Sequence, residues 1–330
     1  MKKFFYIKKI INLLENLKNP KYFIYILFHY LKKSLSIKYA QKLAAKNEKE
    51  YEADGVLDIK IKTYDGSNQC VHPDVVIWKD KLYLVVTPYP YGMEEYENPS
   101  VYYGDTLIDM IELSNNPIDK PLFQNYGYHL SDPCFIKDSK SLYCAYRITE
   151  NRKINKIVYK KYLENNKWEK AKVLLKSEKD LLLSPAIAFI DDKIIMYHVC
   201  LKDLGSSIVY TIFNNKAEFI KSKEIKCQNL PKDYYIWHIG INFNDVSEIL
   251  NKEKKIEGVF LLRNRRNNFK LFKAETSGLG KEWLLGEECI FNSKLKSIIK
   301  IPYKACLIPK TNQILMSYRD KKDRYRLTII

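Results

Sequence analysis

The sequence predicts an all-β protein made of five repeated strand units, preceded by an N-terminal α-helical extension. Three observations lead to this prediction. Tyr, Val, Ile and Leu form many short runs of the kind that favour strands. A unit with a polar start and two apolar strands recurs five times, and successive units begin about 50–65 residues apart. Because this spacing is typical of propeller blades, we expect a five-bladed β-propeller over residues 55–330, after an extension over residues 1–50.

The extension is strongly basic and amphipathic. Residues 1–50 contain twelve lysines and three glutamates, within a chain whose formal net charge is +17. Apolar residues recur at helical spacing from Phe4 to Leu17, and the second apolar stretch, Tyr22–Leu31, is shorter than the roughly 20 residues that cross a bilayer. We expect residues 1–33 to bind an anionic membrane surface. Packing of these helices on the propeller and a targeting peptide are the alternatives.

Charge and cysteine content bear on partners and location. The basic residues make nucleic acid a partner to test, but no zinc-finger, homeodomain or RNA-recognition motif is present. We therefore expect no nucleic-acid partner. The seven cysteines form no C-x-x-C pair, and unpaired reduced thiols are typical of a reducing compartment. The predicted location is cytoplasmic, with peripheral association at the inner face of the membrane as a further expectation.

Each repeat consists of a polar or proline-containing start, an apolar strand, a turn and a second apolar strand. The first strands are predicted at 72–78, 131–137, 184–190, 237–243 and 303–309. The second strands are predicted at 81–87, 141–147, 193–199, 258–264 and 313–319. Third and fourth strands fit the intervals, for example at 153–162 and 168–175.

The last repeat is shorter than the others. It contains about one more strand, at 324–330, and the strand at 56–62 could complete it. Pairing between these two segments would close the ring of blades. A β-sandwich with coincidental similarity between its strands is the alternative fold.

The repeat predicts which side chains meet. In a propeller the first strand of each blade lines the central channel and the second runs antiparallel to it, so first-strand starts and second-strand ends share one face. The candidate substrate-binding residues at these places are His72, Arg147, His198, Trp237, His238, Arg263 and Arg319. Carboxylates, histidines, arginines and aromatic residues around one funnel are suited to a sugar or another small molecule.

Several segments resemble a known family. HPDVV (72–76), YLVVTPYPYGMEEYENPSVYYG (83–104), NNPI (115–118) and SDPCFI (131–136) are similar to segments of the five-bladed propellers of glycoside hydrolase family 43 and its relatives. The resemblance covers about residues 55–330. It implies a carbohydrate-active pocket with three carboxylates: a general-base Asp on blade 1, an orienting Asp on blade 2 and a general-acid Glu near blade 3.

Carried over position by position, the resemblance gives candidate catalytic residues. His72 or Asp74 stands where the base would be, and Asp132 stands near the blade-2 carboxylate. The blade-3 segment LLLSPAI (181–187) contains no Glu, so Glu97 is the nearest substitute for the acid.

We therefore expect a glycosidase-like enzyme that acts on an oligosaccharide or polysaccharide, with Asp74, Asp132 and Glu97 as its carboxylates. The arginines and histidines favour an acidic or phosphorylated glycan. A non-catalytic glycan-binding module for polysaccharide assembly at the membrane and a phosphate-using glycosyl-transfer enzyme are the alternatives. No metal-ligand spacing is recognisable, so no cofactor is expected, and a central divalent cation is the alternative.

Overall fold

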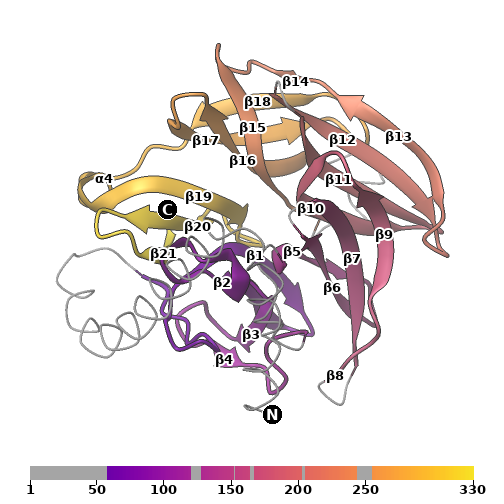
Figure 1. The fold of residues 1–330 in the computed structure, drawn as a ribbon, viewed down its shortest axis with the longest axis horizontal. Helices are drawn as coiled ribbons and strands as arrows, with labels where there is room; N and C mark the ends of the chain where they lie inside the picture. Colours follow the sequence, from indigo (N-terminus) through magenta and orange to yellow (C-terminus); the bar gives the residue numbers. More distant parts are fainter. Residues whose placement is uncertain (1–57, 120–127, 152, 164–166, 203–204, 244–254) are drawn as a thin grey trace, which may run out of the picture.

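The computed structural model describes residues 58–119, 128–151, 153–163, 167–202, 205–243 and 255–330. These residues form five mainly antiparallel sheets arranged around a common centre (Figure 1). The prediction of an all-β, five-bladed propeller is confirmed. The predicted helical extension (1–50) and its membrane-binding segment (1–33) lie outside the described residues. Within the described part of the chain, no helix is long and apolar enough to cross a membrane.

The blades follow one another along the chain. Blade 1 contains β1 (Cys70–Trp78), β2 (Lys81–Pro88), β3 (Ser100–Gly104) and β4 (Ile111–Glu112). Blade 2 contains β5 (His129–Lys137), β6 (Leu142–Glu150), β7 (Ile154–Leu163), β8 (Lys167–Trp168) and β9 (Lys172–Ser177). Blade 3 contains β10 (Leu181–Ile190), β11 (Lys193–Lys202), β12 (Gly205–Asn214) and β13 (Phe219–Ile225).

The last two blades depart slightly from this pattern. Blade 4 contains β14 (Cys227–Gln228), β15 (Tyr234–Ile241), β16 (Ile256–Asn264), β17 (Phe269–Thr276) and β18 (Trp283–Glu288). Blade 5 contains β19 (Ile299–Leu307), β20 (Ile314–Asp320) and β21 (Tyr325–Ile329). A short helix, α4 (Ser293–Ile298), connects blades 4 and 5, and two 3-10 turns, η2 (Pro90–Gly92) and η3 (Glu94–Tyr96), lie between β2 and β3.

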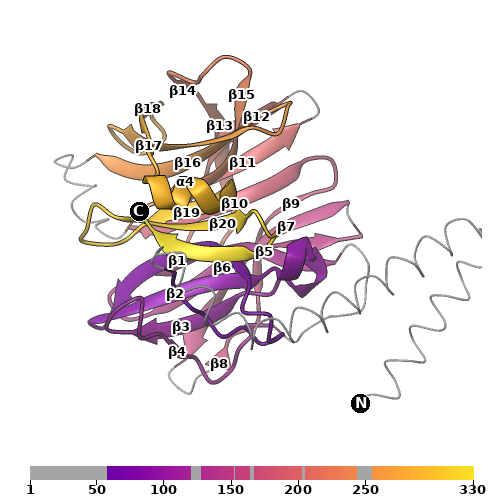
Figure 2. The same cartoon turned by 90° about the vertical axis from the view of Figure 1, so that its left-hand side faces the viewer.

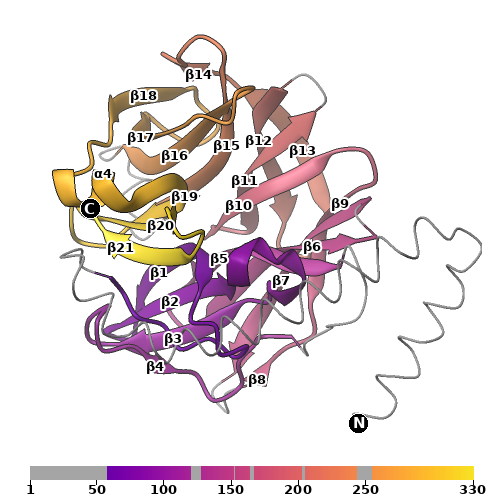
Figure 3. The ribbon, with the colours of Figure 1, turned by 60° about the vertical axis from the view of Figure 1, so that its left-hand side comes forward.

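The first strand of every blade is innermost, as the repeat predicted. Strands β1, β5, β10, β15 and β19 contact their neighbours in a closed circle around the axis. The turned views show blade 5 lying between blade 1 and blade 4 (Figures 2 and 3). Five clusters of buried apolar side chains fill the spaces between adjacent blades. Each blade is therefore held by the faces of its two neighbours, because one twisted sheet cannot bury both of its faces alone.

The two ends of the described chain close the ring. Asp58 forms an isolated antiparallel bridge with Thr328 of β21, and the Ile59 N–H donates to the Leu327 carbonyl at 2.9 Å. This pairing completes blade 5, as predicted, although it is shorter than the strand expected at 56–62. Arg326 adds a buried ion pair with Asp58.

Candidate functional site

A backbone irregularity recurs near the start of every innermost strand. The register between first and second strands shifts between Val71 and Asp74, Ser131 and Cys134, Leu183 and Ala186, Ile236 and His238, and Pro302 and Ala305. In blades 1 to 3, the bulged residues His72, Asp132 and Ser184 have positive φ values of 55°, 54° and 48°. A proline follows each of them, which a bulge tolerates because its N–H is not needed for the ladder.

The repeated bulge brings polar side chains from four blades into one buried cluster, the polar floor, which consists of His72, Glu97, Asp132, Ser184 and His238. Asp132 lies at its centre. Its Oδ1 lies 3.2 Å from His238 Nδ1 and 3.5 Å from His72 Nε2, and it accepts a hydrogen bond from Ser184 Oγ at 3.3 Å. Ser184 Oγ also lies 2.7 Å from His238 Nδ1.

His72 connects the two carboxyl groups of the polar floor. Its Nδ1 lies 3.0 Å from Thr87 Oγ1 and 3.4 Å from Glu97 Oε1, whereas its Nε2 faces Asp132. Glu97 reaches this place from the η3–β3 connection, and its other oxygen lies 3.9 Å from His129 Nε2. One imidazole ring therefore separates Glu97 from Asp132.

The two carboxyl groups have opposite protonation preferences. Burial raises the pKa of Glu97 well above its ordinary value, and the attraction of Arg147 offsets only part of this effect. Burial also raises the pKa of Asp132, but the attraction of His72, His238 and Arg147 outweighs it and leaves that pKa well below the ordinary value. Burial lowers the pKa of His72 and of His238. Glu97 is thus the proton-bearing carboxyl and Asp132 the ionised one.

Two buried cationic side chains, Arg147 and Lys304, lie next to the polar floor. Arg147 Nε donates to Asp132 Oδ2 at 3.2 Å, and its Nη1 also reaches Thr149 and Asn155. Lys304, which is 2% exposed, donates from Nζ to the Pro133 carbonyl at 3.1 Å. Because Lys304 belongs to blade 5 and Pro133 to blade 2, this bond crosses the centre of the ring.

Partly exposed aromatic residues adjoin the polar floor and form the aromatic rim: Tyr89, Trp237 and Tyr303. The Tyr303 ring centroid lies 5.3 Å from that of His72 and 5.4 Å from that of His238. Trp237 contacts His238 edge-on at 5.8 Å. The Arg263 guanidinium lies 4.4 Å from the centre of the Trp237 ring. The site thus combines a polar base with apolar walls, which is the usual composition of a small-molecule or sugar site.

The strand register places the other predicted substrate-binding residues differently from Arg147. Arg147 lies opposite Ser131, immediately before the bulge, whereas Arg263 and Arg319 lie one residue further along their strands, opposite Tyr235 and Ile301. Since a shift of one residue turns a side chain to the other face of a sheet, these three arginines do not form a ring of equivalent positions. Arg319 pairs with Asp323 at 3.1 Å and lies 5.9 Å from the Tyr325 ring.

His198 also differs from Arg147 in its position. It lies opposite Val209 of β12, one residue before the place equivalent to Arg147, and it is 2% exposed. Burial lowers its pKa to about 4. These features are those of a neutral histidine in the interior of blade 3.

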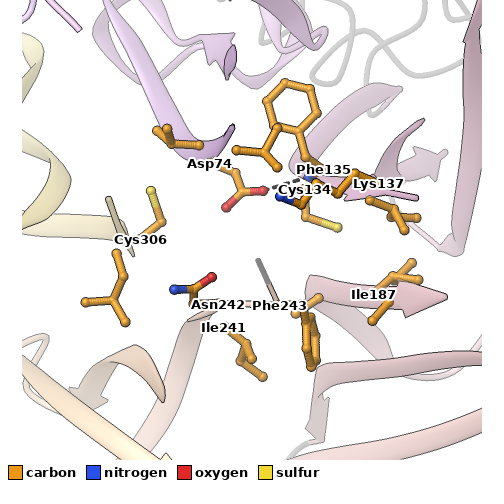
Figure 4. Close-up of a pocket in the computed structure, with 15 residues that line it drawn as sticks. Asp74, Cys134, Phe135, Lys137, Ile187, Ile241, Asn242, Phe243 and Cys306 are labelled. Atoms are coloured by element: carbon orange, nitrogen blue, oxygen red, sulfur yellow. Dashed lines mark hydrogen bonds between the residues drawn. The ribbon is translucent and has the colours of Figure 1, made fainter. Parts of the chain in front are cut away.

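Asp74 lies past the bulge and lines a different pocket, inside the channel formed by the innermost strands. All five blades contribute to the lining of this pocket, which includes Cys134, Asn242 and Cys306. Figure 4 shows Asp74 and Asn242 on opposite sides of it. The Phe135 N–H donates to Asp74 Oδ2 at 2.7 Å, and burial raises the Asp74 pKa to about 6.

The bulge decides between the two residues that the family resemblance offered for the base position. His72, Asp132 and Ser184 occupy equivalent places in blades 1, 2 and 3, so His72 and not Asp74 corresponds to the blade-1 position. Of the three carboxylates that the resemblance implies, only Asp132 is present at its bulge, and Ser184 stands in blade 3.

Sequence reasoning left some members of the site without a role. Ser184 was recognisable as a first-strand start, and its Ser-Pro pair matches the Asp-Pro pair of blade 2. Thr87 was likewise recognisable as a second-strand end, at the place that Arg147 holds in blade 2, whereas His129 and Tyr89 carry no signal in the sequence that separates them from ordinary strand and loop residues. Their contribution depends on contacts between loops and strands that only the folded ring brings together.

Comparisons with known proteins identify the fold. No family model matches the chain, and no curated protein matches it. A thermostable family-43 glycoside hydrolase has a similar structure, with a TM-score of 0.56 at 14% identity, over 79% of this chain and 88% of that one. An endo-arabinase from Bacteroides thetaiotaomicron gives a TM-score of 0.55 at 10% identity, over 83% and 95% of the two chains. An α-L-arabinanase from Cellvibrio cellulosa gives 0.54 at 12% identity, over 79% and 90%. The chain therefore has the five-bladed propeller fold found in family-43 glycoside hydrolases, as the resemblance implied.

Proposed function

We propose that the protein binds a glycan on the face of the propeller where the innermost strands begin. The observation that carries this proposal is the buried polar floor next to the partly exposed rings of Tyr89, Trp237 and Tyr303. A sugar presents hydroxyl groups and apolar C–H faces together, and such a site offers partners for both. A propeller of similar fold, an α-L-arabinanase from Penicillium chrysogenum, is described as complexed with arabinobiose, which supports a sugar ligand here.

A glycan array with the full chain, followed by calorimetry on the glycans retained, tests this proposal. Trp237→Ala removes the largest ring of the aromatic rim, and we expect the affinity of the chain for the glycan to fall about tenfold or more, which corresponds to roughly 1.4 kcal/mol. Trp168→Ala is the matched control, because Trp168 packs on Tyr162 in the outer part of blade 2. Absence of any bound glycan, or equal loss in both variants, would contradict the proposal.

Cleavage of the glycan is the second candidate function, and the charge states of Glu97 and Asp132 favour it. One protonated and one ionised carboxyl are what acid–base cleavage of a glycosidic bond requires. Glu97 would then donate the proton to the leaving oxygen, in place of the absent blade-3 Glu. Against it, His72 lies between the two groups, and His72 and Ser184 stand where the resemblance implies carboxylates.

Product release from the bound glycans separates cleavage from binding. If cleavage occurs, Glu97→Gln and Asp132→Asn should abolish it, whereas Asp74→Asn should retain it because Asp74 lines the other pocket. Retained cleavage in Glu97→Gln would remove Glu97 from the acid role. No product from the wild-type chain would leave binding as the function.

We also propose that the ligand carries an acidic or phosphate group. Arg263 lies beside the aromatic rim, and Arg319 lies beside Tyr325, whose ring is 5.7 Å from that of Tyr303. Guanidinium groups bind carboxylates and phosphates through paired hydrogen bonds. Tighter binding of an acidic glycan than of its neutral counterpart, weakened in Arg263→Gln, is the expected result. Turnover that depends on added phosphate would instead indicate a phosphate-using transferase.

Membrane association through residues 1–33 remains a proposal, supported by their lysines and amphipathic sequence. The full chain should sediment with vesicles that contain anionic lipid, whereas a chain that starts near residue 52 should not. Equal sedimentation of both would contradict it.

A further inference from the structure

We propose that His72, Asp132 and His238 form a binding site for one divalent transition-metal ion of the Zn²⁺ type. This inference goes beyond glycan binding and does not depend on it. Each of the three residues offers one ligand atom, and these atoms lie within 4.8 Å of one another. Two imidazoles and one carboxylate are a frequent ligand set for such ions.

The distances between the ligand atoms fit tetrahedral coordination. Zn²⁺ binds imidazole nitrogen and carboxylate oxygen at about 2.0–2.1 Å, which places two tetrahedral ligand atoms about 3.3 Å apart. The observed separations from Asp132 Oδ1 are 3.2 Å to His238 Nδ1 and 3.5 Å to His72 Nε2. The Ser184 hydroxyl lies 3.3 Å from the same oxygen and would neighbour a fourth ligand on the ion.

His72 Nε2 and Asp132 Oδ1 face each other at 3.5 Å, a distance that a proton or a metal ion between them can bridge. Thr87 Oγ1 lies 3.4 Å from the Val71 carbonyl, to which it donates, and 3.0 Å from His72 Nδ1, from which it accepts when the imidazole carries its proton on Nδ1. In this neutral tautomer, His72 Nε2 presents a lone pair to Asp132 Oδ1. Two buried acceptors that face each other repel unless a cation or a proton lies between them.

The surroundings complete the description of the site. Glu97 Oε1 lies 3.4 Å from His72 Nδ1, so a carboxyl group stands behind this imidazole, as carboxyl groups commonly do behind metal-binding histidines. Arg147 occupies the other oxygen of Asp132, Oδ2, and leaves Oδ1 for the ion. His238 would exchange its Nδ1 proton for the metal. The charges of Arg147 and Lys304 oppose a cation, so binding requires the anionic charge of Asp132.

Metal titration of the full chain, stripped with a chelator, tests the proposal with ZnCl₂ alone. We expect one Zn²⁺ per chain, a raised melting temperature, and the intense visible bands of tetrahedral Co²⁺ when cobalt replaces zinc. His238→Gln and Asp132→Asn should lose this binding. Thr87→Val, which leaves all three ligands in place, should weaken it about 10–100-fold. His198→Gln, at a buried histidine of blade 3, should bind as the wild type does.

Several results would overturn the assignment. These are no stoichiometric zinc binding by the wild type, binding that survives both ligand substitutions, or tighter binding of Ca²⁺ than of Zn²⁺. If the ligand variants fail to fold, judged by circular dichroism, the wild-type stoichiometry, the Co²⁺ spectrum and Thr87→Val decide the question. Absence of metal binding would mean that a proton on His72 holds the cluster together.

Discussion

The ion pair between Asp58 and Arg326 joins the first described residues of the chain to its last strand, and its removal should destabilise the whole ring. Arg326 Nε donates to Asp58 Oδ2 at 2.7 Å, and both side chains are buried, at 3% and 8% exposure. Arg326→Met removes the guanidinium that pairs with Asp58 while keeping a side chain of similar length. Removing one partner of a buried pair typically costs about 3–5 kcal/mol.

The surrounding contacts place the expected loss at the lower end of that range. After the substitution, the Tyr318 hydroxyl still donates to Asp58 at 3.2 Å, and Arg324 still pairs with Asp320 at 2.7 Å. We therefore expect Arg326→Met to lower the free energy of unfolding by about 3 kcal/mol, a large part of the 5–15 kcal/mol typical of folded proteins. Chemical denaturation followed by circular dichroism measures this change.

A matched surface pair provides the control. Lys255 and Glu275 lie 2.6 Å apart at 63% and 36% exposure, so Lys255→Met should cost less than about 1 kcal/mol. A loss below about 1 kcal/mol in Arg326→Met as well would refute the view that this pair closes the ring. A double-mutant cycle with Asp58→Asn isolates the interaction from other effects of each substitution.

Two further predictions concern pH and packing. The pKa of Asp74 rises from 3.8 to about 6 in the folded chain because the carboxyl is buried, so folding favours its protonated form; the stabilisation is complete below about pH 4 and is lost as pH rises to about 6. Asp74→Asn should remove this dependence, worth up to about 3 kcal/mol, and parallel pH dependence of unfolding in both proteins would count against it. A Cβ at Gly240 would lie 2.2 Å from the Ala305 carbonyl oxygen, whereas one at Gly286 would lie 3.5 Å from its nearest neighbour. Gly240→Ala should therefore lower the free energy of unfolding by about 1–3 kcal/mol or more. Gly286→Ala is the control. Equal melting temperatures for the two variants would show that β15 and β19 can move apart without a loss of stability.

The five-blade architecture could be predicted because it depends on local patterns. Each blade repeats a polar start, an apolar strand, a turn and a second apolar strand, and the observed innermost strands contain the starts at His72, Asp132, Ser184, Trp237 and Tyr303. Strand identity follows from runs of adjacent residues, and a period of blade length indicates a ring. The pairing of Asp58 with Thr328 followed from the missing strand of the last repeat.

Which residues belong to the polar floor depends on the register between strands, and the local sequence pattern does not specify this register. Asp74 and His72 are two residues apart, yet the bulge places His72 in the polar floor and Asp74 at another pocket. Likewise, Arg147 contacts Asp132, whereas Arg263 lies one residue beyond the equivalent place and stacks on Trp237. In a strand, a single inserted residue reverses the face on which every later side chain lies. The number and order of the blades can therefore be predicted from the sequence. The contacts of each polar side chain are determined only by the tertiary structure, which brings the five bulges together around one axis.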